Sequence, residues 1–258
     1  MDTDNKPVPV LSGYKNVSKT FTYAITYAVL PLFFAYQIGT SILSEGRMVW
    51  EINGVDAIFQ RISTLYGILP TEAGLPLSLL FLAVGSILAI RYERKKYGSI
   101  EIQKSYLLTT IKDAFLISLL VNPIAAFFAH GVLVIPFAKG FSAVSSFHEF
   151  LPQITPAAGA GFYEELFFRV IILGSLVCLL RYITKLSTGS QFIGVLVTAI
   201  FFSAIHFTGP MAYEYTLWRV VYLFCLGVMY GALYLKRGLA TTAWTHTFAN
   251  LFVTSGIF

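Results

Sequence analysis

The stretch Gly161-Phe-Tyr-Glu-Glu-Leu-Phe-Phe-Arg-Val170 places two adjacent carboxylates and an arginine at the start of an apolar run. That run continues as Val170-Ile-Ile-Leu-Gly-Ser-Leu-Val-Cys-Leu-Leu180 and has the composition of a membrane span. Ionisable residues at membrane depth are costly, and by default they mark a functional site. The stretch therefore predicts a helical membrane protein and indicates where its chemistry lies.

The composition of the whole chain supports this class. Of 258 residues, 56% are hydrophobic and only 12% are charged, and the mean hydropathy is +0.71. Such a chain is too apolar for an ordinary soluble domain. The net charge of +5 does not indicate nucleic-acid binding, because the basic residues gather at the ends of apolar runs. Nothing resembles a linker or a repeat, so we expect one integral membrane domain over residues 1–258.

A helix needs roughly 20 mainly apolar residues to cross the hydrocarbon core. Seven segments qualify, at about 20–44, 74–91, 111–136, 161–181, 190–208, 216–235 and 239–257. Residues 45–69 and 141–154 mix charges with apolar residues and are expected to lie along the membrane interface; if one of them inserts, the count becomes eight. Pro136, Pro152 and Pro156 are expected to break the surrounding helices.

Lysine and arginine predict the orientation. Four basic clusters fall on one side of an alternating seven-span path: Lys6, Lys15 and Lys19; Arg91, Arg94, Lys95, Lys96 and Lys104; Arg181 and Lys185; Lys236 and Arg237. The positive-inside rule places these clusters, and with them the N-terminus, in the cytoplasm. We expect a multi-pass protein of a prokaryotic cell membrane, with its C-terminus outside.

The two glutamates differ in their helical surroundings. Glu165 and Arg169 are four residues apart, so they share a helix face and can pair. Glu164 is turned roughly 100° from Glu165 at 3.6 residues per turn, which leaves it to face a cavity. Gly159 and Gly161 leave room for close helix contact. These positions predict a structural Glu165–Arg169 pair and a functional Glu164.

Two later spans carry isolated polar groups. His206 follows Phe202 by four residues, so the aromatic ring can pack under the imidazole. His246 and Asn250 are also four apart and share a face of the last span. Counted from the cytoplasmic ends, these groups and Glu164 reach similar depths. The sequence therefore predicts a hydrolytic site between the fourth, fifth and last spans.

These residues fall into three ordered motifs: Glu164-Glu165-x-x-x-Arg169, Phe202-x-x-x-His206 and His246-x-x-x-Asn250. In this order, the motifs resemble those of the CPBP family (CaaX proteases and bacteriocin-processing proteins). That family of intramembrane glutamic proteases includes the type II CaaX prenyl endopeptidases and the Abi proteins. The resemblance covers roughly residues 155–254, which would form the catalytic core of an all-α polytopic transmembrane bundle.

The resemblance implies roles for the polar residues. Glu164 would act as general base on a water, and His206 would share in that activation. His246 and Asn250 would donate hydrogen bonds to the oxyanion that develops on the peptide carbonyl. The remaining motif residues would support the site: Glu165, Arg169 and Phe202. The substrate would be a membrane-associated protein or peptide, including a lipidated one.

Alternatives remain for the cofactor and for the function. No cofactor is expected, but Glu164, His206 and His246 also make up a catalytic zinc set. A non-catalytic membrane scaffold, or a bacteriocin-immunity or regulatory protein, is the main alternative to a peptidase. A transporter that uses Glu164 and the histidines as a proton relay is a more distant one.

Overall fold

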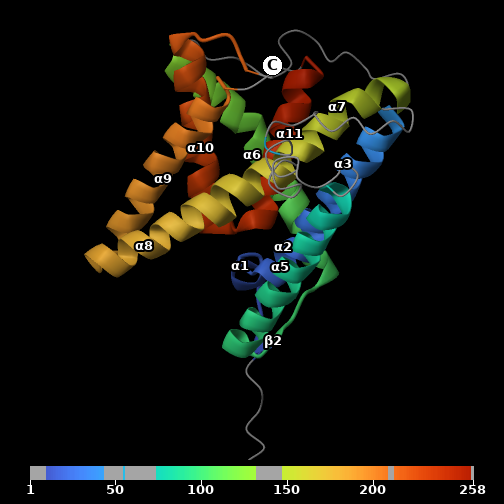
Figure 1. Cartoon of the computed structure of the whole chain (residues 1–258), viewed down its shortest axis with the longest axis vertical. Helices are drawn as coiled ribbons and strands as arrows, with labels where there is room; N and C mark the ends of the chain where they lie inside the picture. The colour runs from blue at the N-terminus through green and yellow to red at the C-terminus, as the bar shows by residue number, and fades with distance from the viewer. Residues whose placement is uncertain (1–9, 44–54, 56–73, 132–146, 209–211, 257–258) are drawn as a thin grey trace, which may run out of the picture.

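The computed structural model describes residues 10–43, 55, 74–131, 147–208 and 212–256, and this part of the chain is almost entirely helical (Figure 1). The elements are β1 (Val10–Leu11), α1 (Tyr14–Val17), α2 (Phe21–Ala24), η1 (Ile25–Val29), α3 (Leu30–Leu43), α5 (Gly74–Tyr97), β2 (Ser99–Ile100), α6 (Lys104–His130), α7 (Phe147–Gly159), η4 (Ala160–Glu164), η5 (Leu166–Leu173), α8 (Gly174–Thr184), α9 (Ser187–Ile205), α10 (Leu217–Arg237) and α11 (Leu239–Thr254). The η elements are π-helical.

Within the described residues, six helical stretches are long and apolar enough to cross a membrane: Phe21–Leu43, Leu75–Tyr97, Lys104–His130, Phe150–Thr184, Ser187–Ile205 and Leu217–Arg237. The chain is therefore a multi-pass integral membrane protein. The first six predicted spans match these six stretches in order. The seventh predicted span, 239–257, is not among them. The third stretch begins and ends earlier than the predicted 111–136. The predicted interfacial segment at residues 45–69 lies outside the described part of the chain, apart from Val55.

The fourth stretch corrects a prediction about proline. Pro152 and Pro156 lie inside α7 and do not break it, and the helical path continues through η4 and η5 to the end of α8. Close packing of α7 on α3 holds this segment: a Cβ on Gly39 would collide with Thr155, and a Cβ on Gly159 would lie 2.5 Å from the Tyr36 ring. Proline is tolerated in membrane helices where neighbouring elements stabilise the backbone.

The predicted seventh span, 239–257, is the shorter helix α11. Its 16 residues give a length of about 24 Å at 1.5 Å per residue, less than the roughly 30 Å of the hydrocarbon core. The helix packs against α6, α7, α10, η1 and η4. Its buried residues include Thr241, Thr242, Thr245, His246 and Thr247. Thus α11 is the central helix of the bundle.

Two features tie the start of the first stretch to the end of α5. The strands β1 and β2 pair in parallel, with Val10 opposite Ser99 and Leu11 opposite Ile100. The Glu93 carboxylate accepts hydrogen bonds from the backbone of Phe21 at 2.6 Å and of Thr22 at 2.8 Å. Glu93 thereby satisfies N–H groups that have no intrahelical partner at a helix start.

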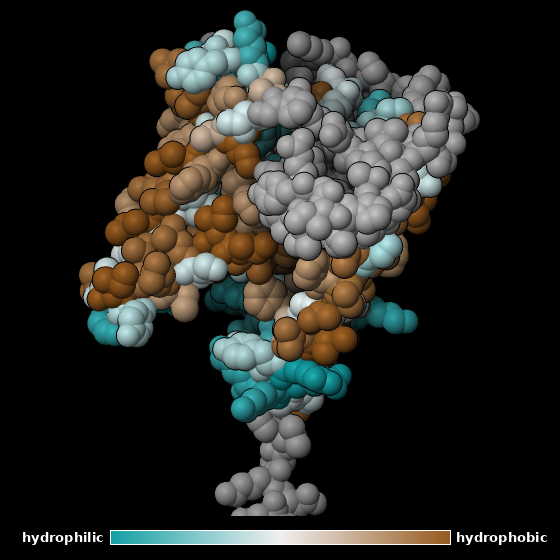
Figure 2. All heavy atoms as spheres, viewed as in Figure 1, coloured by the Kyte–Doolittle hydropathy of each residue, from teal (hydrophilic) through white to brown (hydrophobic). Residues whose placement is uncertain are grey.

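The surface separates into an apolar band and polar ends. In Figure 2 the helices α8, α9 and α10 show a nearly continuous hydrophobic face, and hydrophilic residues gather at its lower edge. Both the α8–α9 junction and the β2 end of α5 lie toward the lower end of the view in Figure 1. The basic clusters around Arg181 and Arg94 therefore lie toward one end of the bundle, as their sequence positions predict.

Candidate active site

The stretch from Gly161 to Arg169 lies on helix that is partly π-helical. Glu164 is the last residue of η4, and Arg169 lies within η5. π-Helical turns are rare and occur frequently at functional sites. Gly161 presses η4 onto α11 so closely that a Cβ there would collide with Thr247 and lie 2.6 Å from the carbonyl oxygen of Ala243. The predicted close approach at Gly161 is confirmed, and it brings Glu164 alongside α11.

The predicted pairing of Glu165 with Arg169 is also confirmed. Arg169 Nε donates to Glu165 Oε2 at 3.0 Å, Nη2 lies 3.5 Å from Oε1, and both side chains are fully buried. The guanidinium carbon lies 5.1 Å from the centre of the Phe202 ring and 5.9 Å from that of Tyr230. Aromatic faces stabilise a desolvated cation, so the buried arginine has both a counter-ion and an aromatic surround.

Glu165 has a second contact that sequence reasoning missed. Its Oε1 lies 2.9 Å from Nδ1 of His246, which is 3% exposed. Because the ionised carboxylate only accepts hydrogen bonds, Nδ1 of His246 carries the hydrogen, and Nε2 faces Glu164. The Tyr230 ring stacks on the imidazole at 4.5 Å and 23°. Helical spacing cannot reveal this contact, because the two residues are 81 positions apart.

His206 is fixed at the end of α9 as the spacing with Phe202 predicts. The two ring centres lie 4.8 Å apart, and Nδ1 of His206 donates to the Phe202 carbonyl oxygen at 2.6 Å. A carbonyl oxygen can only accept, so the hydrogen is again on Nδ1. The other nitrogen, Nε2, is directed at Glu164.

The three residues predicted for one site therefore converge. Oε2 of Glu164 lies 3.8 Å from Nε2 of His206 and 3.9 Å from Nε2 of His246. The residues come from η4, the end of α9, and α11, so the fourth and fifth stretches meet the last helix here. Both separations exceed the 2.7–3.2 Å of a direct hydrogen bond. A water within hydrogen-bond distance of Glu164 and one imidazole fits such a spacing.

Asn250 lies one helical turn beyond His246 on α11 and is half-buried. Among the described residues, no hydrogen bond joins its side chain to Glu164 or to either histidine. Its helix is positioned by Asn122 of α6, which donates to the Ala249 carbonyl oxygen at 3.0 Å and accepts from the Tyr222 hydroxyl at 2.8 Å. Sequence reasoning did not single out Asn122, although an amide inside an apolar run is a signal that could have identified it.

Tyr213 is a further neighbour of the site that the sequence did not indicate. Its backbone N–H donates to the His206 carbonyl oxygen at 2.8 Å, and its ring stacks on the imidazole at 5.7 Å and 24°. Desolvation raises the pKa of the Tyr213 phenol, and the Glu164 carboxylate raises it further. The hydroxyl therefore stays protonated at neutral pH and can donate a hydrogen bond.

The donor atoms are wider apart than a zinc site needs. Tetrahedral zinc holds nitrogen and oxygen ligands at roughly 2.0–2.2 Å, which puts the ligands about 3.3–3.5 Å from one another. The Glu164–histidine separations are 3.8 and 3.9 Å. Within the described ranges, no group of three His, Cys, Asp or Glu residues is arranged to hold a metal ion.

Fold and site together define a multi-pass membrane protein with a carboxylate–imidazole cluster inside its helical bundle. Residues 146–252 match the family model described as type II CAAX prenyl endopeptidase Rce1-like. This match confirms the family resemblance over the segment that holds the π-helical motif, both histidines and Asn250. Searches of curated proteins and of solved structures found no match.

Proposed function

We propose that this protein is an intramembrane peptidase that hydrolyses a peptide bond with a glutamate-activated water. The observation that carries the proposal is the convergence of Glu164 Oε2 on two imidazole nitrogens, at 3.8 and 3.9 Å, inside a bundle of apolar helices. The match of residues 146–252 to the prenyl endopeptidase model supports the same reaction class.

The positions of the hydrogens suggest how the water is activated. With Nδ1 of His206 committed to the Phe202 carbonyl, the neutral ring presents the lone pair of Nε2 to the site. A water can then donate one hydrogen to Glu164 and the other to His206, which leaves an oxygen lone pair for the substrate carbonyl carbon. Glu164 takes the proton as the carbon–oxygen bond forms, and later delivers it to the departing amine nitrogen.

His246 serves the oxyanion in this scheme. Its Nδ1–H is held by the Glu165 carboxylate, and a ring that also carries a hydrogen on Nε2 donates that hydrogen to the developing negative charge. In that form of the ring the charges balance, because the two carboxylates of Glu164 and Glu165 face two cations, Arg169 and His246. Buried charges are tolerated when they are paired in this way. Asn250, on the same face of α11, is the second donor.

The proposed substrate is a membrane-associated protein or peptide. The family name suggests a prenylated C-terminal sequence as the first candidate to test. The proposed location is a prokaryotic cell membrane, with the basic ends of the helices and the N-terminus in the cytoplasm.

The test uses the full chain in proteoliposomes with a panel of prenylated and unprenylated membrane peptides. Glu164→Gln keeps the side-chain shape but removes the base, and it should abolish cleavage without lowering the unfolding temperature. The matched control is Glu214→Gln, because Glu214 is an exposed carboxylate with a side chain 84% accessible. Full turnover by Glu164→Gln on a cleaved substrate would contradict the mechanism.

A second experiment separates this mechanism from zinc catalysis. The purified protein should hold well under one zinc per chain and should stay active after dialysis against a strong chelator. A zinc site makes another prediction: His206→Ala and His246→Ala lose the metal, and Asn250→Ala keeps it. Full biological function of both Glu164→Ala and His246→Ala would instead favour the non-catalytic scaffold.

A further inference from the structure

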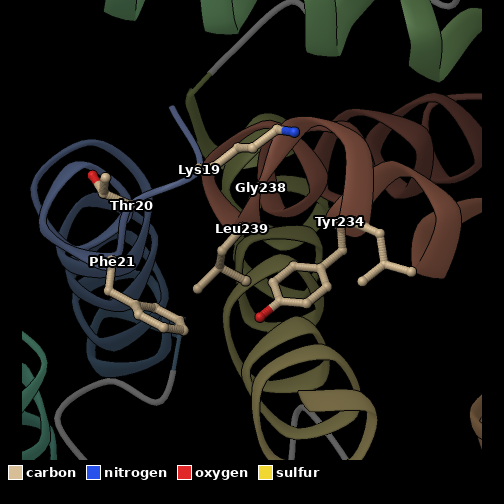
Figure 3. A pocket seen from close by; sticks show the side chains of 7 residues that line it. Lys19, Thr20, Phe21, Tyr234, Gly238 and Leu239 are labelled. Carbon is tan, nitrogen blue, oxygen red and sulfur yellow. The ribbon is translucent and has the colours of Figure 1, made fainter. Parts of the chain in front are cut away.

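A second candidate binding site lies away from the carboxylate–imidazole cluster. A pocket of about 210 Å³ opens between the start of the first apolar stretch and the turn that joins α10 to α11 (Figure 3). Its lining residues are Lys19, Thr20, Phe21, Tyr234, Leu235, Gly238 and Leu239. The proposed peptidase reaction uses none of them.

The pocket lies where apolar helix changes to basic loop. Lys19 comes two residues before the stretch that begins at Phe21, and Tyr234 lies in the last turn of the stretch that ends at Arg237. In a membrane this is the depth of the lipid headgroups, where tyrosine and lysine side chains concentrate. The lining has the same division, because it combines a lysine and a tyrosine with the apolar side chains of Phe21 and Leu239; in Figure 3 the Tyr234 hydroxyl lies near these two, and the Lys19 amine extends away from them.

Two polar groups of the lining are available to a ligand. Among the residues that the structure describes, Lys19 has no carboxylate partner, whereas nearby Arg237 pairs with Asp113 at 3.2 Å. In the same described part, the Tyr234 hydroxyl makes no hydrogen bond, and in Figure 3 it points into the space between Phe21 and Leu239. The Thr20 hydroxyl is already engaged, because it donates to the Val17 carbonyl oxygen at 2.8 Å.

The floor of the pocket is fixed by the backbone. Gly238 has a φ of +86°, a backbone conformation that residues with a side chain rarely adopt. A Cβ at this position would collide with the Ser18 carbonyl oxygen and lie 2.8 Å from Cα of Lys19. The α10–α11 turn is therefore pressed directly against the segment that carries Lys19, and the pocket is a built feature of the fold.

We propose that this pocket binds the headgroup of an anionic phospholipid. Lys19 Nζ and the Tyr234 hydroxyl bind the phosphate, and Phe21, Leu235 and Leu239 contact the glycerol and the first acyl carbons. The volume is below the roughly 300–1,000 Å³ of pockets that enclose a drug-sized ligand, so the site takes a headgroup and leaves the chains in the bilayer. Basic pockets between helices suit anionic headgroups for this reason.

The test measures lipid binding by the purified, delipidated full chain with native mass spectrometry. Phosphatidylglycerol, phosphatidylcholine with the same acyl chains, and glycerol 3-phosphate are titrated separately. Phosphatidylglycerol should bind more tightly than phosphatidylcholine, and glycerol 3-phosphate should not bind measurably. Lys19→Gln should weaken phosphatidylglycerol binding roughly fivefold, from the loss of one basic side chain at the surface.

The matched control is Lys15→Gln, which removes the same charge from an exposed position in the same segment but outside the pocket lining. It should leave the affinity unchanged. Tyr234→Phe keeps the ring and should weaken binding roughly twofold to tenfold, the net effect of one hydrogen bond. Equal losses in Lys15→Gln and Lys19→Gln, no preference for the anionic lipid, or equally tight glycerol 3-phosphate binding would each overturn the proposal.

Discussion

Helices α5 and α11 differ in polarity and in burial: α5 is apolar and exposed to the surroundings of the bundle, and α11 is more polar and buried inside it. The α5 stretch is strongly apolar, and no residue in its most apolar part is buried inside the bundle. By contrast, α11 carries four buried threonines and a buried histidine and is surrounded by other elements. Lipid solvates apolar side chains but offers no hydrogen bonds to polar ones. Of these two helices, the more polar one therefore lies inside, and the more apolar one faces out.

The same contrast appears at two glycines. A Cβ on Gly85 of α5 would meet nothing within 4 Å, whereas a Cβ on Gly161 would collide with Thr247 of α11. Helices that associate in membranes use small residues to bring backbones together. Substitutions at the α11 contact should therefore be costly, and equivalent ones on α5 should not.

The largest expected effect comes from removing the buried cation. Arg169→Met leaves the fully buried Glu165 carboxylate without its counter-ion, and loss of one partner of a buried pair costs about 3–5 kcal/mol. The free energy of unfolding in mixed micelles measures this cost. The control is Arg219→Met: its pair with Glu214 is largely exposed, so the cost should stay below about 1 kcal/mol. Similar costs for both variants would contradict the central role of the pair.

The second effect concerns the rate of peptide cleavage. If Asn250 donates to the oxyanion, Asn250→Ala should lower kcat by roughly 10²–10³, as removal of one such donor does elsewhere. Steady-state kinetics on a cleaved peptide measure the change. Thr254→Ala, an exposed position one turn further along α11, should leave kcat unchanged. A wild-type kcat in Asn250→Ala would exclude Asn250 from the oxyanion site.

The third prediction compares the two glycines directly. Gly161→Ala should destabilise the protein by about 1–3 kcal/mol, because the added methyl overpacks the contact with α11. Gly85→Ala should be neutral or slightly stabilising, because alanine is the better helix former. Unfolding temperatures of the two variants, measured side by side, give the sign of each effect. Equal shifts would mean that η4 and α11 are less closely packed than the structure shows.

The smallest effect is the coupling between Asn122 and Tyr222 across α6 and α10. A double-mutant cycle with Asn122→Leu and Tyr222→Phe should give a coupling free energy of about 0.6 kcal/mol, and at most about 1.7 kcal/mol, as for other interhelical hydrogen bonds in membranes. Strict additivity of the two single variants would show that the 2.8 Å hydrogen bond contributes no stability.

The features that sequence predicted well are local ones. The Glu165–Arg169 pair, the packing of Phe202 on His206 and most span positions follow from helical spacing and hydropathy, and all are present in the structure. The errors concern the influence of neighbours. Pro152 and Pro156 were expected to end a helix, but packing on α3 keeps α7 intact. The last span was expected to cross the membrane like the others, and it is a short central helix.

The sequence by itself determined the class of protein, the order of its apolar helices and the polar residues available for chemistry, because hydropathy and residue spacing are properties of the chain. Only the tertiary structure decided which of these residues meet. Glu165 binds His246 across 81 positions, Tyr213 stacks on His206, and Lys19 and Tyr234 line the same pocket. Such contacts depend on how helices pack and rotate against one another, which no periodicity within a single helix encodes.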